Sequence, residues 1–355
     1  MINDILHVGK KNTFVTGRAS TAIYLILLSN DIMDKLVLVP ANICFAAIYP
    51  ILYSGNQPLF IDVGDDGNLT YDIVVRTFKS PLASQISAVL LPHMYGNPCA
   101  DVNLISDYLH QQDILLIEDC ALAMGAEVCQ QNVGSFGDYA IYSFGYSKTI
   151  DIGNGGLIAS SRNLDKITDY SNKLNLISEK SISDLKLLSQ INRVIRNNEE
   201  NDLVRFIFDC IPKLYKDAFI YKADEELINA IEFKIKDLSL VIDERRQKQF
   251  YYHSKLKKNN HFNIYDFNEG AVPWRFNLLV NPRVKRNLIE CMLENRVAVS
   301  DWYPVVTRMF GVYDEFPNAD KMEKEIINFP VISISYTEID RICGLINYYF
   351  EKIEL

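Results

Sequence analysis

The first 160 residues alternate short apolar runs with longer segments of helical spacing. Most of the apolar runs are rich in Leu, Ile or Val and bounded by Pro, Gly or Asp, which is typical of strands buried on both faces. Four other segments predict helices, three of which start at a residue that favours helix N-termini. The expected strands are 36–39, 58–63, 86–91, 114–117, 139–144 and 156–160, and the expected helices are 20–30 (capped by Ser20), 43–53, 70–79 (Thr70) and 101–112 (Asp101).

This alternation predicts an α/β fold with three layers and a site at the carboxyl ends of the strands. One stretch, from Leu36 to Ile61, contains no charged residue and is long enough to span a membrane. Pro40, Pro50 and the turn-like pair Ser54-Gly55 interrupt it. We therefore interpret it as a buried strand, a helix and a second buried strand, and expect no membrane association.

The character of the chain changes after Ser160. Residues 163–255 are polar and helical in pattern, and they include a long helix at about 224–258. The last hundred residues mix strands with helices, which predicts a smaller α+β domain. We expect a large domain over 1–245, with a diverged helical segment at 163–225, and a small C-terminal domain over 246–355. The C-terminal elements expected are the strand 274–280 and the helices 283–295 and 337–351.

The amino-acid composition limits the partners, metal sites and cellular compartment that we expect for this protein. The 355 residues carry a formal net charge of −9, which argues against a nucleic-acid partner because such proteins show a basic footprint. The seven cysteines are scattered without CxxC or metal-ligand spacing, so we expect reduced thiols, a reducing compartment and no metal. The N-terminal residues show no apolar signal segment. A cytoplasmic location follows as an expectation.

The familiar catalytic motifs are missing from the sequence: no GxGxxG follows the first strand, and no Walker, GxSxG or HExxH motif occurs. Polar residues instead stand at the expected strand ends, namely Asp119, Ser143 and Lys148, and Ser20 opens the first helix. A lysine, a carboxylate and a helix start that holds phosphate are what pyridoxal 5′-phosphate (PLP) requires. The spacing alone also allows a solvated lysine and an aspartate that caps the next helix.

Five segments resemble the DegT/StrS family of PLP-dependent, fold-type I sugar aminotransferases. They are VTGRASTAIYLIL, PLFIDV, LPHMYGNP, IEDCALAMGA and VGSFGDYAIYSFGYSKTIDIGNGGLIAS. The resemblance is nearly continuous over 14–160 and fainter at 228–246, 301–306 and 329–342. It implies a mainly parallel large-domain sheet, PLP as cofactor, glutamate as amino donor, a nucleotide-linked keto-sugar as acceptor, and a homodimer with shared active sites.

The same resemblance assigns roles to individual residues. Lys148 matches the lysine that forms the Schiff base and moves a proton between the substrate and the cofactor. Asp119 matches the partner of the pyridinium nitrogen, and Ala121 the small residue against one ring face. Phosphate binding falls to Ser143, Ser20 and Thr21.

The substrate side is less defined. His93 and Tyr95, in the H-x-Y-G turn, match positions that line it, although a structural turn with a packed tyrosine explains them equally well. Tyr303, within the DWYPVV segment, and Arg308, just after it, are further candidates, against ordinary surface packing. No motif names the sugar, its nucleotide or the carbon that is aminated.

Three positions depart from the family pattern. Leu122 stands where relatives bond the cofactor's phenolic oxygen with Gln or His. Cys44 replaces the ring-stacking aromatic, which leaves the adjacent Phe45 as the candidate for this contact with the cofactor. The segment 221–223 lacks the N-x-R that reaches the partner subunit's phosphate. These departures leave three hypotheses open: a sugar aminotransferase, a PLP enzyme for another carbonyl acceptor such as a cyclitol or non-nucleotide sugar, and an inactive DegT-like sensor or assembly protein.

Overall fold

A central sheet of seven strands organises the computed structural model, which describes residues 2–196 and 214–353. The strand order is β1-β9-β8-β5-β4-β2-β3, and β9 alone runs antiparallel to its neighbours within the sheet. All six predicted strands are present, which confirms the mainly parallel α/β fold. The sequence analysis missed the short edge strand β1. The strands are β1 (Asn12–Thr16), β2 (Leu36–Pro40), β3 (Gln57–Ile61), β4 (Ile86–Pro92), β5 (Leu115–Asp119), β8 (Tyr139–Ser143) and β9 (Gly156–Ser160).

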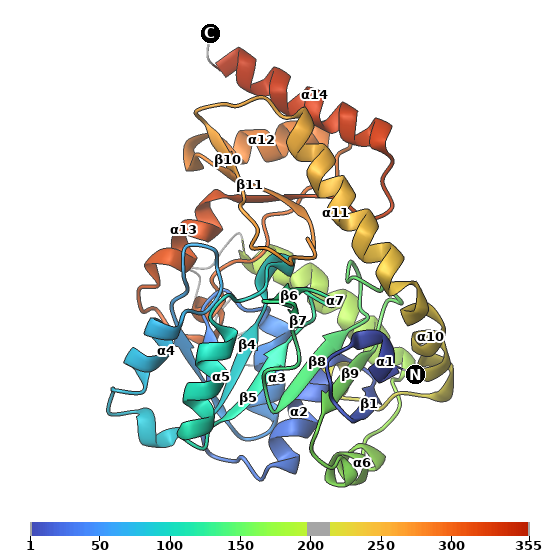
Figure 1. Cartoon of the computed structure of the whole chain (residues 1–355). Coiled ribbons are helices and arrows are strands. Elements are labelled where there is room, and N and C mark those ends of the chain that lie inside the picture. The colour runs from blue at the N-terminus through green and yellow to red at the C-terminus, as the bar shows by residue number, and fades with distance from the viewer. Residues whose placement is uncertain (1, 197–213, 354–355) are drawn as a thin grey trace.

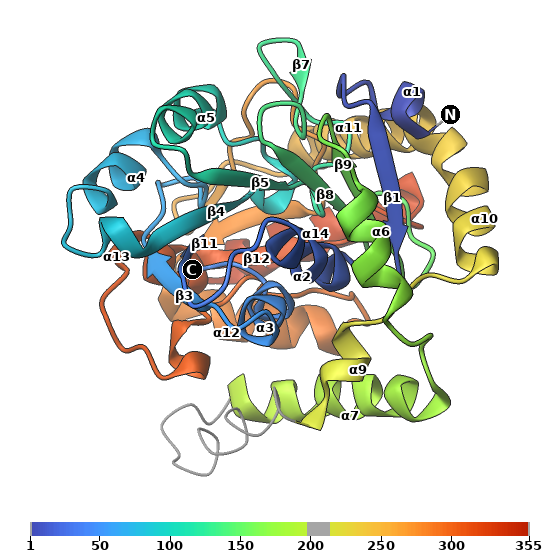
Figure 2. The ribbon, with the colours of Figure 1, turned by 90° about the horizontal axis from the view of Figure 1, so that it is seen from below.

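Helices cover both faces of this sheet, as Figure 2 shows from below. Alternate residues of β4 illustrate why: Ala88 and Leu90 enter the core beneath α2 and α3, whereas Val89 and Leu91 enter the core beneath α4 and α5. The first face carries α2 (Ala19–Ser29), α3 (Phe45–Tyr53), α6 (Asp165–Asn172), α7 (Glu179–Arg196) and α9 (Lys216–Phe219). The second carries α1 (Ile2–Leu6), α4 (Tyr71–Thr77), α5 (Val102–Gln111) and α10 (Glu225–Lys234).

The observed N-termini of the helices agree only in part with those predicted from the sequence. Thr70 caps α4, because its hydroxyl accepts a 3.4 Å hydrogen bond from the N–H of Ile73. Asp101 occupies the cap position of α5, but its carboxylate accepts from Tyr71 N–H instead. The expectation that Ser20 caps α2 is wrong: the helix begins at Ala19, and Arg18 takes the cap position without a side-chain cap bond.

A second, three-stranded antiparallel sheet in the order β10-β11-β12 lies above the large one in Figure 1. The proposed boundary at residue 245 falls inside α11, whose Leu238 packs with the large-sheet cores and whose Tyr252 packs with the small-sheet core. The division into two domains therefore stays a prediction. The elements are α11 (Leu238–Lys255), β10 (Phe262–Ile264), β11 (Phe276–Val280), α12 (Pro282–Glu294), α13 (Pro317–Glu325), β12 (Ile326–Phe329) and α14 (Tyr336–Ile353).

The predicted long helix at 224–258 is present as α10 and α11, with a 3₁₀ turn between them. The uncharged stretch after Leu36 forms β2, α3 and β3, as expected. Among the described helices, none combines the length and apolarity that crossing a membrane requires. Short elements are η1 (Ala83–Gln85), η2 (Met94–Gly96), β6 (Glu127–Val128), β7 (Gln131–Asn132), η3 (Ile235–Asp237) and η4 (Thr307–Phe310).

The close approach of the segment 272–274 to Gly96 gives the first testable prediction. Gly96 has φ +82°, and an added Cβ would lie 2.0 Å from the Val272 carbonyl oxygen. We expect Gly96→Ala to lower the free energy of unfolding by about 3 kcal/mol, because it adds backbone strain and breaks this contact. Gly344→Ala is the control: it lies in α14 with open space around it, so alanine should raise stability by about 0.5–1 kcal/mol. Urea unfolding measures both, and equal effects would contradict the prediction.

Candidate active site

The carboxyl ends of the parallel strands gather the chemistry-bearing loops at one edge of the large sheet. β2, β4, β5 and β8 all end there, and β1 leads from the same edge into α2. The small sheet and its connections lie over this edge (Figure 1). Several main-chain hydrogen bonds join the two parts; for example, Val272 N–H donates to Gly96 O, and Trp274 N–H donates to Tyr95 O.

Asp119 is the last residue of β5 and is largely buried at this edge. Its Oδ1 accepts a 2.9 Å hydrogen bond from Ala121 N–H, and its other carboxylate oxygen has no hydrogen-bond partner in the described part of the chain. Burial raises the pKa of the Asp119 carboxyl, while Ala121 N–H, Lys148 and His93 oppose that rise. The carboxylate therefore has room for one more cationic donor.

Lys148 lies half-buried in the loop between β8 and β9. Burial lowers the pKa of its amine, whereas the nearby Cys44 and Asp119 raise it, and Arg18 and Arg245 lower it further. These mutual effects place Lys148, Asp119 and Cys44 around one site. A lowered pKa increases the neutral fraction of the amine, which is the nucleophilic form.

Arg245 of α11 holds the Lys148 loop in place, a role that the sequence analysis missed. Its side chain is almost completely buried, and the guanidinium donates 2.9 Å hydrogen bonds to the carbonyls of Lys148, Pro273 and Trp274. Trp274 adds a bond from its indole N–H to Ser147 O at 2.8 Å. No local pattern marks Arg245, because its partners come from two distant loops.

Ser143, the last residue of β8, lies beside the first turn of α2. It pairs across the sheet with Gly156, and a Cβ on Gly156 would come within 2.5 Å of Ala19 N. The Ser143 hydroxyl oxygen accepts from Gly145 N–H at 3.4 Å and keeps its own proton available for donation. Gly156 therefore links Ser143 to the start of α2, and the assignment of Ser143 to phosphate binding stays a prediction.

The hydroxyls of Ser20 and Thr21 have protein partners. Ser20 Oγ donates to Ala46 O at 2.8 Å. Thr21 Oγ1 contacts Phe219 O and Tyr221 O and accepts from Tyr221 N–H at 3.2 Å. These two hydroxyls fix α3 and the 219–221 segment onto α2, and the assignment of Ser20 and Thr21 to phosphate binding stays a prediction.

The surroundings of His93 favour the structural turn, one of the two alternatives that its sequence motif allowed. It is fully buried, and its Nδ1 accepts from Cys99 N–H at 3.0 Å, so Nε2 carries the proton and donates to Glu118 at 3.2 Å. Glu118 also accepts from Gly134 and Gly137 N–H groups. His93, Glu118 and Cys120 could in principle hold a metal ion, but these hydrogen bonds occupy the histidine and carboxylate atoms.

Tyr95 and Tyr303 belong to an aromatic cluster over the site. The Tyr95 side chain is buried, and its backbone adopts the left-handed conformation with φ +62°. Its hydroxyl accepts a hydrogen bond from Tyr303 N–H at 3.5 Å. Tyr303 packs against Trp274, with ring centroids 5.6 Å apart, and lies near Asp119 and Cys44. Leu122 fills the same cluster, so its departure from the family pattern serves packing.

The two remaining candidates, Phe45 and Arg308, lie in positions that are less favourable for contact with the cofactor or the substrate. Phe45 packs on Trp302, at 6.5 Å between centroids, and the position next to Lys148 and Asp119 is that of Cys44. Arg308 forms a 3.3 Å ion pair with Asp320 and is about two-fifths exposed. The structure thus gives Arg308 a surface role and offers no support for a substrate contact.

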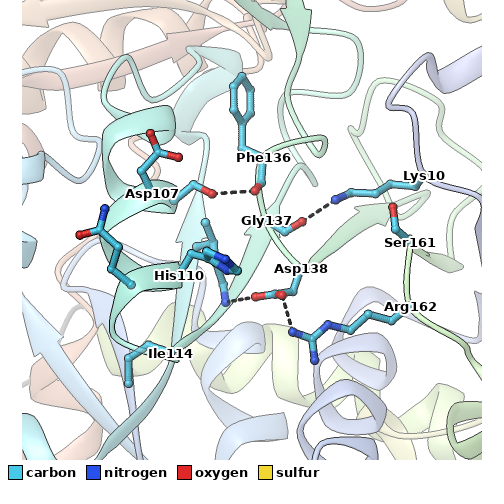
Figure 3. Close-up of a pocket in the computed structure, with 12 residues that line it drawn as sticks. Lys10, Asp107, His110, Ile114, Phe136, Gly137, Asp138, Ser161 and Arg162 are labelled. Atoms are coloured by element: carbon cyan, nitrogen blue, oxygen red, sulfur yellow. Dashed lines mark hydrogen bonds and ion pairs between the residues drawn. The ribbon is translucent and has the colours of Figure 1, made fainter.

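A separate cavity lies at the opposite edge of the sheet, where β5 and β8 begin (Figure 3). Its lysine and arginine side chains, Lys10 and Arg162, are already engaged: Lys10 donates to Gly137 O, and Arg162 pairs with Asp138, each at 2.5 Å. Sites in open α/β sheets form at the carboxyl ends of strands, so we place the active site around Lys148 and not here.

Comparison with known proteins agrees with this geometry. The DegT/DnrJ/EryC1/StrS aminotransferase family profile matches residues 6–181, which include Asp119, Ser143 and Lys148. The chain belongs to this family. A family relative named GDP-perosamine synthase, from Escherichia coli O157:H7, is 32% identical over 155 residues, covering 44% of this chain and 41% of that protein.

Other similar proteins align over more of the chain. The dTDP-3-amino-3,6-dideoxy-alpha-D-galactopyranose transaminase of Aneurinibacillus thermoaerophilus is 24% identical over 97% of this chain and 87% of its own. The crystal structure of the aminotransferase from Psychrobacter cryohalolentis superimposes with a TM-score of 0.79 at 17% identity, covering 99% of this chain and 90% of that chain. This likeness establishes the shared fold.

The residues at the site fit the family's PLP. A partly buried lysine with a lowered pKa, an aspartate with an unused carboxylate oxygen, and a serine hydroxyl beside an uncapped helix start are the groups that this cofactor needs. They come from the ends of β5 and β8, the loop after β8 and the start of α2, all at one edge of the sheet.

Proposed function

We propose that the protein is a PLP-dependent aminotransferase that moves an amino group from glutamate to a nucleotide-linked keto-sugar, in amino-sugar biosynthesis. The observation that carries this proposal is the placement of Asp119 at the end of β5 and of Lys148 in the loop that follows the neighbouring parallel strand β8, where each affects the pKa of the other. The names of the relatives, which are transaminases or synthases of GDP-, UDP- and dTDP-linked sugars, support the substrate class.

In this proposal PLP supplies an electron sink that stabilises negative charge on the carbon bearing the amino group. Lys148 holds the cofactor through its Nζ and moves a proton at the reacting carbon. Asp119 stays ionised and keeps a proton on the ring nitrogen, and Ala121 leaves space against one ring face. Arg245 positions the Lys148 main chain, and the first turn of α2 with Ser143 binds phosphate.

We assign the substrate side of the active site to the aromatic cluster around Tyr303 and to the adjacent Arg275. Arg275 lies over Trp274, with the guanidinium 5.2 Å from the ring centroid, and donates to Ser147 Oγ at 3.2 Å. No carboxylate pairs with Arg275 among the described residues. Its charge, next to Tyr303, favours anionic substrates such as glutamate or a sugar diphosphate.

We propose a cytoplasmic homodimer with shared active sites. The six cysteines in the described part of the chain are all free, which supports a reducing compartment. Large apolar side chains stand exposed, and Tyr146 lies on the same loop as Lys148; they are Tyr146, Phe233, Leu240 and Phe250. Such exposure is typical of surfaces that pair with another chain. Light scattering during size-exclusion chromatography measures the oligomeric state.

The absorption spectrum of the purified protein with PLP, before and after glutamate is added, tests the function. We expect a visible band from lysine-bound PLP that disappears with glutamate, together with release of 2-oxoglutarate. A band that does not change when glutamate is added would contradict the proposal that glutamate is the amino donor, and it would point to another PLP reaction. No band even with excess PLP would overturn the enzymatic assignment. Rates with nucleotide-linked keto-sugars against free sugars and cyclitols then test the acceptor.

A further inference from the structure

Arg18 places a positive charge at the start of α2 without an acidic partner. It follows β1 through Gly17, takes the cap position of the helix and is half-buried. Its guanidinium lies 5.5 Å from the centroid of the Phe219 ring, and no carboxylate pairs with it among the described residues. Removing a guanidinium from water without a counter-charge is unfavourable, so this arrangement indicates an anionic ligand.

Tyr221 provides a second, independent indication at the same place. Its side chain is 2% exposed, and its hydroxyl has no hydrogen-bond partner in the part of the chain that the structure describes. Arg18 and Asn154 are its polar neighbours: burial raises the pKa of the Tyr221 hydroxyl, and these two groups oppose that rise. A buried hydroxyl beside an unpaired guanidinium provides two donors without an acceptor, which suits a phosphate.

The chain fixes Tyr221 there through contacts with its own α2. Thr21 Oγ1 donates to Tyr221 O at 3.1 Å and accepts from Tyr221 N–H at 3.2 Å, and Gly17 N–H donates to Tyr221 O at 3.2 Å. Gly17 is required for this packing, because a Cβ at that position would lie 2.2 Å from the Tyr221 ring. The segment 219–221 is thereby bound to the helix start of the same chain.

These groups lie next to the phosphate side of the proposed active site. Gly156, which pairs with Ser143, would place a Cβ 2.4 Å from the Arg18 carbonyl carbon. Arg18 also acts electrostatically on both Lys148 and Cys44. An anion held between Arg18, Ser143 and the first turn of α2 is therefore close to the lysine.

Resting on the proposed function, we propose that Arg18, assisted by the Tyr221 hydroxyl, binds the phosphate of PLP from within the same chain. Arg18 supplies a bidentate, charged donor, and Tyr221 supplies a neutral one. In this chain the 221–223 segment, which has no arginine, completes the subsite by presenting the Tyr221 hydroxyl beside Arg18.

The test compares the binding of PLP with that of pyridoxal, which lacks the phosphate, to the unloaded full-length protein by fluorescence titration. We expect Arg18→Gln to weaken PLP binding by about 10–100-fold and Tyr221→Phe by about fivefold, as for charged and neutral hydrogen bonds. Pyridoxal binding should change less than about twofold in either variant. Arg162→Gln, at the opposite edge of the sheet, is the matched control and should bind both compounds normally.

Inorganic phosphate gives a readout that needs no bound cofactor. It should raise the thermal stability of the wild-type protein and of Arg162→Gln, but not that of Arg18→Gln. Equal losses of PLP and pyridoxal binding in Arg18→Gln, or PLP binding that is unchanged, would overturn the phosphate role. Failure of the wild-type protein to bind PLP would instead overturn the proposed function, and this inference with it.

Discussion

A Lys148→Ala variant is expected to lose transamination, with kcat reduced by at least about 10³-fold, because the substitution removes the nucleophilic amine that lies near Asp119. The amine lies beside Asp119 and Cys44, and burial lowers its pKa, so it is the group best prepared to bond the cofactor. Stopped-flow and steady-state assays with glutamate measure the loss. The visible band of lysine-bound PLP should be absent in this variant.

Two further variants show whether covalent chemistry or charge is responsible. Lys148→Arg keeps a cation at the position but cannot bond the cofactor, so it should be as inactive as the alanine variant. Lys166→Ala removes an exposed lysine that pairs with Asp31 at 2.8 Å on the outside of the protein, and it should retain full activity. A Lys148→Ala protein that turned over at the wild-type rate would rule out Lys148 as the cofactor-binding lysine.

Asp119→Asn is expected to reduce kcat by about 10²–10³-fold, since a buried carboxylate that stabilises charge during the reaction is lost. The substitution keeps the shape of the side chain, and the amide oxygen can still accept from Ala121 N–H, so the fold should survive. Thermal unfolding of the variant verifies this, and wild-type kcat in a folded variant would contradict the assigned role.

The pH dependence separates this role from a merely structural one. Burial raises the pKa of Asp119, so wild-type activity should fall as the pH drops through that raised value and the carboxylate takes up a proton. The Asn variant lacks this group. Its residual activity should rise as the pH falls, because solvent acid can then protonate the ring nitrogen. A variant with the wild-type acid limb would show that another group titrates there.

The candidate site could be predicted from the sequence where its residues lie at ends of elements. Asp119 and Ser143 end apolar runs, and Lys148 follows one of them, so the direction of the strands alone places all three at one edge. Side-chain partners were not predictable in the same way. Ser20, Thr21 and His93 match family positions, yet their polar atoms bond neighbours that packing brings to them.

Arg18 and Arg245 are the converse case, because their roles became visible only in the tertiary structure. Arg18 stands within a motif that the sequence analysis quoted, but its lack of an acidic partner is visible only once the surrounding side chains are placed. Arg245 lies in a helix with no local signature, and its role depends on the carbonyls of Lys148, Pro273 and Trp274. Those contacts join residues separated by 28 to 97 positions in the chain.

The sequence by itself determined most of the order of strands and helices, the mainly parallel large sheet and the edge at which we place the site, because local hydrophobic periodicity and short motifs encode them. Tertiary structure alone decided which polar groups remain available for a ligand. That choice depends on contacts such as the one between Thr21 and Tyr221, which are 200 residues apart. Their energies come from burial and hydrogen-bond satisfaction in the folded state, which no local window of the chain contains.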